Sequence, residues 1–248
     1  MSELIICEKP SAALKIATAL ADKTPKKETY KKKVPFYRLT HDKKEIIVAP
    51  AVGHLYSVDE KEKKGWIYPV FEMHWVESSK RNKAQSYSKN YLLNLKKLAK
   101  EVDEVTVACD YDIEGEVIGL NIVRFATKRK DANRMKFSTL TKPDLVNAHE
   151  HKSTHLDWGQ ANAGETRHFL DWMYGINLSR ALTASIKATG AFKLLSIGRV
   201  QGPALKMIVE KEKEILAFKS KPFWQIELKG KVKDGELDAW HIEDKFWE

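Results

Sequence analysis

The chain has 248 residues, of which 43% are hydrophobic, so a sizeable core can form and general disorder is excluded. Lysine and arginine total 43 against 34 acidic residues, and the net charge of +9 favours a polyanionic partner, nucleic acid ahead of membrane. Two cysteines exclude a disulfide scaffold, and without a signal peptide or a membrane-spanning apolar run we expect a cytoplasmic, nucleoid-associated protein.

The first predicted element is a short buried strand, Leu4 to Cys7. A turn at residues 8–11 follows, and alanine-rich helical spacing predicts a helix from Ala12 to Leu20 with Ser11 as its N-cap. The lysine-rich residues 23–33 are predicted to form a solvated surface connection.

A hairpin comes next, with strands predicted at Phe36–Leu39 and Glu45–Ala49. The turn at residues 50–55 places His54 close to a strand end, and residues 90–102 are predicted to be helical.

An acidic turn follows the buried strand predicted at Val105–Ala108, with Asp110, Asp112 and Glu114 spaced by two ahead of a helix at residues 117–125. Acids at the carboxyl end of such a strand occupy the ligand-binding edge of an open α/β sheet. Their mutual repulsion is relieved when a cation lies between them, and Mg²⁺ prefers carboxylate oxygens. The alternative is that these acids cap the helix and complement its dipole.

The remaining elements divide the chain. A strand at residues 136–138 and a helix at residues 144–151 complete a strand–helix alternation typical of a mostly parallel α/β sheet. Helices are then predicted at residues 162–177, 178–188 and 201–218, and a strand at residues 223–228. We therefore expect an α/β domain at 1–153, a helical domain at 154–220 and the start of a β region at 221–248.

Several motifs carry a resemblance to a known family. Ile6–Ser11 and Asp110–Glu116 together resemble the Toprim domain, a Rossmann-like fold found in topoisomerases, primases and nucleases. Ser196–Leu205 resembles the DNA-holding segment of type IA DNA topoisomerases. Arg167–Ala181 resembles the helix that precedes this segment in those enzymes. The segment Val52–Leu55 also resembles the sequence of this family. The similarity extends from Leu4 to about Trp247 and is greatest to the archaeal and topoisomerase III-like branch.

The resemblance implies roles for the acidic residues. Glu8 would lie at the scissile phosphate as general acid toward the leaving 3′ oxygen, a role that suits a carboxyl with a raised pKa. Asp110 and Asp112, with Glu114 nearby, would hold Mg²⁺. Lys9 would offer a cation to the phosphate, although outside this motif it would be interpreted as a solvated surface lysine.

The resemblance also implies contacts to single-stranded DNA. Ser196, Arg199 and Gln201 would contact the strand, since a helix start beside an arginine is a suitable phosphate site. Arg167 and Arg180 could line the groove on the preceding helices.

Three of these residues have equally good structural interpretations. Arg167 and Arg180 could form surface salt bridges to Asp171 or another acid. His54 could contact the site or be a hydrogen-bonded core histidine.

The nucleophile of the family is expected outside this chain. Type IA enzymes cut one strand through a tyrosine, and none of the eight tyrosines here lies in a Tyr-Pro-Arg-Thr-like setting. Covalent cleavage cannot proceed without an activated nucleophile. We expect either a fragment or, preferably, one subunit of a split enzyme whose partner polypeptide carries the tyrosine.

The sequence thus predicts the Mg²⁺-binding, DNA-holding half of a type IA topoisomerase, an isomerase that relaxes negatively supercoiled DNA. No Gly-x4-Gly-Lys-Ser/Thr loop occurs, so ATP binding of that kind is not expected. The alternatives are a Toprim-type nuclease, against which the Arg199 segment argues, and a catalytically inert DNA-binding module.

Overall fold

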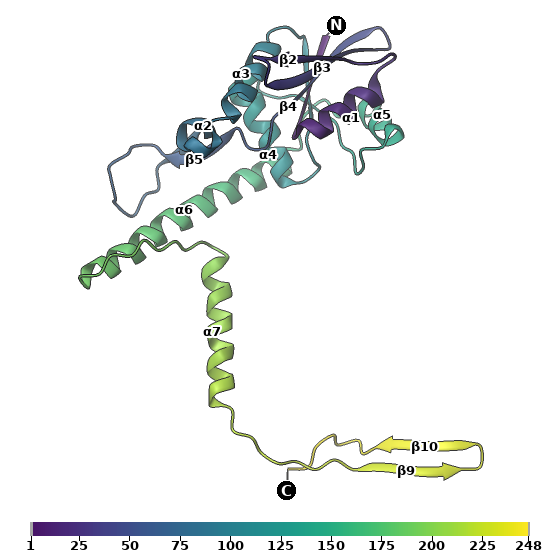
Figure 1. The fold of residues 1–248 in the computed structure, drawn as a ribbon, viewed down its shortest axis with the longest axis vertical. Helices are drawn as coiled ribbons and strands as arrows, with labels where there is room; N and C mark the ends of the chain where they lie inside the picture. Colours follow the sequence, from purple (N-terminus) through teal and green to yellow (C-terminus); the bar gives the residue numbers. More distant parts are fainter. Residues whose placement is uncertain (1, 248) are drawn as a thin grey trace. The chain divides into compact units, whose positions relative to one another are not determined.

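The computed structural model describes residues 2–247. It divides into two compact units, one ending at Gly198 and the other beginning at Arg199, and each is described by itself (Figure 1).

The first unit is built on a six-stranded sheet in the order β2-β3-β4-β1-β7-β8. The strands are β1 (Ser2–Cys7), β2 (Lys26–Tyr30), β3 (Val34–His41), β4 (Lys44–Pro50), β7 (Glu104–Ala108) and β8 (Asn133–Arg134). Strand β1 runs parallel to β4 and to β7, and β7 runs parallel to β8, whereas β2, β3 and β4 pair antiparallel. The predicted mostly parallel α/β sheet and the predicted hairpin are confirmed.

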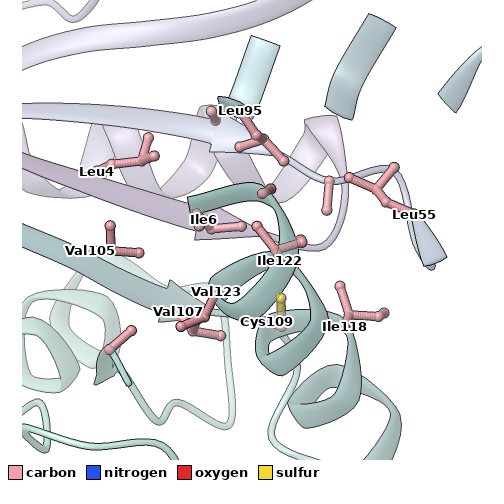
Figure 2. Packing of buried hydrophobic residues seen from close by; sticks show 14 of the residues in the cluster. Leu4, Ile6, Leu55, Leu95, Val105, Val107, Cys109, Ile118, Ile122 and Val123 are labelled. Atoms are coloured by element: carbon pink, nitrogen blue, oxygen red, sulfur yellow. The ribbon is translucent and has the colours of Figure 1, made fainter. Parts of the chain in front are cut away.

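Helices cover both faces of this sheet. Successive strand residues point to opposite faces, so Ile5 and Cys7 pack in one buried cluster with α1 (Pro10–Leu20) and α5 (Lys142–Glu150). Leu4 and Ile6 pack in the other, against α3 (Ser88–Leu98) and α4 (Ile113–Asn121), as Figure 2 shows. A π-helical turn, η2 (Ile122–Thr127), continues α4. The strand ends are thereby held between two packed layers.

A long helix, α6, packs beside α4 at its amino-terminal end. Helix α6 (Trp158–Ala188) has 31 residues and contacts α4 through Gly164. A Cβ atom on this glycine would lie 2.5 Å from the carbonyl oxygen of Ile113 and 2.4 Å from Val117 Cγ2, so a side chain there would force the helices apart. A separate hairpin of β5 (Tyr56–Glu60) and β6 (Met73–Glu77) precedes the short helices α2 (Ser78–Arg81) and η1 (Lys83–Gln85).

The second unit holds α7 (Gln201–Ala217) and an antiparallel hairpin of β9 (Glu227–Val232) and β10 (Gly235–Trp240). None of the helices within residues 2–247 combines the length and the apolar character needed to span a membrane.

The structure corrects several predicted elements. Residues 23–33 contain β2, an edge strand whose polar residues hid it from a pattern search. Ser11 does not cap α1, because the helix begins at Pro10, whose fixed φ suits a first helical position. The strand predicted at 136–138 is wrong, since β8 lies at Asn133–Arg134.

The two predicted helices at 162–177 and 178–188 form the single helix α6. Glycine in a helix interior is less favourable than alanine by only about 1 kcal/mol, so Gly175 does not end the helix. The strand predicted at 223–228 instead begins at Glu227.

A buried carboxylate at the start of β1 makes stability depend on pH. Glu3 is fully buried, forms ion pairs with Lys44 and Lys152 and is hydrogen-bonded to His149 and Thr106. Burial raises its pKa, but the hydrogen bonds from His149, Lys152 and Thr106 outweigh this and hold the pKa well below 4.5.

We therefore expect the Glu3 ion pairs to contribute stability above pH 4.5 and to lose that contribution as the pH falls below 4.5. Glu3→Gln should reduce the free energy of unfolding at neutral pH and flatten its decline in acid. Urea unfolding at a series of pH values measures both quantities. Glu72→Gln, which removes an exposed carboxylate, is the control, and a Glu3→Gln profile parallel to that of the unsubstituted chain would contradict the assignment.

Candidate functional site

Two acids follow neighbouring parallel strands at the carboxyl edge of the sheet. Cys7 of β1 is in register with Ala108 of β7, so Glu8 comes directly after one strand end and Asp110 comes two residues after the adjacent one. Lys9 Nζ lies 3.3 Å from Asp110 Oδ2 and 3.8 Å from Glu8 Oε1. The structure thus brings together the two acids and the lysine that the sequence singled out.

The charges at this edge perturb one another. Burial raises the pKa of Glu8, and the neighbouring Asp110 carboxylate raises it further. The hydrogen bond to Asp110 raises the pKa of Lys9. A positive charge therefore lies beside two carboxylates, one of which is shifted toward its protonated form.

Asp112 both caps helix α4 and lies at the same edge of the sheet as Asp110. Its Oδ1 accepts a hydrogen bond of 2.7 Å from the amide of Gly115, so it is the N-cap of α4, as the capping alternative predicted. Gly115 is required here, because a Cβ atom would lie 2.1 Å from the carbonyl oxygen of Asp110. Asp110 and Asp112 line a surface cavity together with Lys9.

A buried arginine, Arg134, donates hydrogen bonds to the backbone of the acidic turn. Arg134 and Glu116 are both fully buried, and Arg134 Nε lies 2.7 Å from Glu116 Oε2. Arg134 Nη1 and Nη2 donate to the carbonyl oxygens of Cys109 (2.9 Å) and Asp110 (3.0 Å). Arg134 was not predicted as a site residue, because nothing in its local sequence distinguishes it from a surface arginine.

Glu114 is turned toward a different set of partners. Its Oε2 lies 3.1 Å from His54 Nε2 and 2.9 Å from His168 Nε2, and its Oε1 lies 3.4 Å from Arg167 Nη1. Within residues 2–247, His54, Glu114 and His168 form the one group of three metal-ligating side chains whose donor atoms lie within 4.8 Å of one another. The expected trio of Asp110, Asp112 and Glu114 is not gathered in this way.

His54 is placed by a strained loop that is tied to the end of β1. The amides of Ala51 and Gly53 donate to the carbonyl oxygens of Cys7 (2.7 Å) and Glu8 (3.0 Å). Val52 has a φ of 66°, a left-handed value that is an outlier for a β-branched residue. His168 was missed by the sequence analysis, although it lies in the Arg167–Ala181 segment that carried the resemblance.

The two arginines of α6 differ in their surroundings. Arg180 is buried, pairs with both carboxylate oxygens of Glu60 at 3.0 and 3.1 Å and donates to the carbonyl oxygen of Ile67. This favours the salt-bridge interpretation of Arg180 over a groove contact, with Glu60 as the acid. Arg167 is half exposed and contacts Glu114 and Asp171.

The predicted DNA-holding residues lie on both sides of the division between the units. Ser196 is in a segment tied to α6, since the Leu195 amide donates to Thr183 Oγ1 and the Ile197 amide to Ser179 Oγ. Arg199 begins the second unit, and Gln201 is the first residue of α7.

Comparisons with known proteins agree on one family. Residues 3–140 match the family model of the Toprim domain, and residues 155–248 match that of DNA topoisomerase. DNA topoisomerase 1 of Methanocaldococcus jannaschii is 50% identical over 100% of this chain and 32% of its own length. DNA topoisomerase 1 of Pyrococcus horikoshii is 46% identical over 99% of this chain and 36% of its own length.

A solved structure has the same fold. Full-length topoisomerase I from Thermotoga maritima aligns over 99% of this chain and 36% of its own length, with a TM-score of 0.65 and 24% identity. The chain thus spans about a third of the length of the relatives it matches.

Proposed function

Because the chain belongs to the type IA DNA topoisomerase family, whose Toprim domain it contains, we propose that it is the metal-binding and DNA-holding part of such an enzyme. The proposed reaction is ATP-independent cleavage, passage and religation of one DNA strand, which relaxes negatively supercoiled DNA. The observation that carries this proposal is the pairing of Glu8 and Asp110, with Lys9 between them, at the ends of adjacent parallel strands.

The donor set at this edge fits Mg²⁺. Asp110 and Asp112 are carboxylates facing a surface cavity that leaves room for the waters Mg²⁺ retains. Lys9 Nζ lies 3.3 Å from Asp110 Oδ2, and this contact with a cation supports the proposal that the edge favours positive charge. Mg²⁺ would supply charge neutralisation at the phosphate oxygens. Asp110 and Asp112 are its proposed ligands, and Glu114 would have to leave His54 and His168 to join them.

The remaining residues at the edge have proposed roles toward the scissile phosphate. Glu8, with its raised pKa, can hold a proton and donate it to the leaving 3′ oxygen. Lys9 can pair with a phosphate oxygen. His54 is a proposed DNA contact, although its Nε2 is hydrogen-bonded to Glu114 Oε2.

The DNA-holding role is proposed for Arg167, Ser196, Arg199 and Gln201. Arg167 is half exposed on α6, and Arg199 and Gln201 stand at the start of α7, where helix amides favour an anion. We propose that the nucleophilic tyrosine is supplied by domains corresponding to the remaining length of the relatives or by a second polypeptide.

A relaxation assay tests this proposal. The chain is incubated with negatively supercoiled plasmid and Mg²⁺, alone and with the carboxyl-terminal domains of a relative supplied in trans. We expect relaxation only in the complemented mixture, because the nucleophile must come from the added domains. Omitting Mg²⁺ from that mixture should abolish relaxation.

Two other outcomes would contradict the proposal. Metal-dependent nicking by the chain alone would identify a Toprim nuclease. Retardation of single-stranded DNA without any change of topology in either mixture would identify an inert DNA-binding module.

A further inference from the structure

We propose that His54, Glu114 and His168 form a binding site for a transition-metal ion, with Zn²⁺ as the best match, distinct from the carboxylates of Asp110 and Asp112. This inference goes beyond the proposed function and does not depend on it. It rests on the convergence of two imidazoles and one carboxylate from three separate parts of the first unit.

The distances between the donor atoms suit a small ion. Glu114 Oε2 lies 3.1 Å from His54 Nε2 and 2.9 Å from His168 Nε2. Tetrahedral ligands at bonds of about 2.0–2.1 Å lie about 3.4 Å apart, so each contact need open by only a few tenths of an ångström. The two imidazole rings lie side by side, inclined at 58° to each other, with centroids 4.8 Å apart.

The donor types select a transition ion over Mg²⁺. Imidazole nitrogen suits Zn²⁺, whereas Mg²⁺ requires oxygen ligands. Two histidines and one carboxylate match the ligand set of several catalytic zinc sites, in which water takes the fourth position. The side chains of His54, Glu114 and His168 are 30%, 37% and 27% exposed, so water can reach the group.

The second carboxylate oxygen of Glu114 faces an arginine. Arg167 contacts Oε1 of Glu114, not the Oε2 atom that both histidines approach, and so leaves that oxygen available to an ion.

The surroundings of His54 predict a moderate affinity. The N–H of the second ring nitrogen of a metal-ligating histidine usually donates a hydrogen bond to a partner that fixes the tautomer. His54 Nδ1 is buried and has no hydrogen-bond partner among the described residues. We therefore expect binding that is weaker than that of a structural zinc site but specific to these three residues.

Titration calorimetry of the chain with Zn²⁺ alone, without DNA, tests the site. We expect one ion per chain, and an ordered four-coordinate spectrum when Co²⁺ replaces Zn²⁺. His168→Gln should weaken Zn²⁺ binding by more than about 100-fold, since losing even an outer-shell partner costs about 10–100-fold. His54→Gln should have a similar effect.

Two control variants separate this site from others. His151→Gln removes an exposed histidine at the end of α5 and should leave Zn²⁺ affinity unchanged. Asp112→Asn should also leave it unchanged, although it alters the proposed Mg²⁺ site. Unchanged affinity in both His54→Gln and His168→Gln would overturn the proposal, as would loss of Zn²⁺ binding in Asp112→Asn. None of these measurements requires topoisomerase activity, so failure of the zinc site and failure of the proposed function are distinguishable.

Discussion

Replacing Arg134 with methionine is expected to lower the free energy of unfolding by about 3–5 kcal/mol, the usual cost of breaking a buried ion pair by removing one partner. Both Arg134 and Glu116 are fully buried, so Arg134→Met leaves the Glu116 carboxylate without its counter-ion. The carbonyl oxygens of Cys109 and Asp110 also lose their donors. Urea unfolding measures the loss.

The double variant Arg134→Met with Glu116→Leu should recover part of this stability, because no charge is then left buried. Recovery should be incomplete, since the amide of Asp157 donates to Glu116 Oε1 at 2.8 Å and loses that acceptor. Lys63→Met breaks the ion pair between an exposed lysine and the partly buried Asp59, and it should cost no more than about 1 kcal/mol. A loss in Arg134→Met as small as that in Lys63→Met would show that the arginine does not support the turn.

The double substitution Asp110→Asn with Asp112→Asn is expected to reduce Mg²⁺-dependent relaxation by the complemented enzyme by at least about 100-fold, because direct ligands should matter at least as much as outer-shell partners. Folding should be retained. Asparagine caps a helix as well as aspartate does, so residue 112 can still accept the Gly115 amide. The initial rate of plasmid relaxation as a function of Mg²⁺ concentration measures the effect.

Glu72→Gln is the matched control, because it removes one exposed carboxylate whose ion-pair partner is Lys61. It should relax plasmid at the rate of the unsubstituted chain. Equal rates in the double variant and in Glu72→Gln, at every Mg²⁺ concentration, would remove Asp110 and Asp112 from the metal site.

The sequence predicted which edge of the sheet carries the acidic residues, because a few consecutive residues are enough to mark the end of a buried strand. An apolar strand followed at once by a polar turn marks the carboxyl end of a buried strand, and parallel strands end on the same side of the sheet. The strand pattern therefore placed Asp110 at this edge, and the family resemblance placed Glu8 and Lys9 beside it. The same local pattern also supported the alternative that the acids cap α4, as Asp112 does.

Other site features depend on contacts between residues far apart in the chain. Glu114 belongs to the acidic run in sequence, but it lies on the first turn of α4, where α6 packs closely through Gly164 and presents His168 and Arg167 to it. The sequence left Arg180 open between a groove contact and a salt bridge, because its partner Glu60 lies 120 positions earlier and no local pattern links the two residues.

The amino-acid sequence by itself determined the α/β class, the strand ends that carry Glu8 and Asp110 and the family motifs, because periodicity and turn residues act over a few positions. Only the tertiary structure decided which partner each charged side chain has. A long side chain at a helix surface can reach several acids or bases, and the packing of α4, α6 and the loop before His54 selects among them.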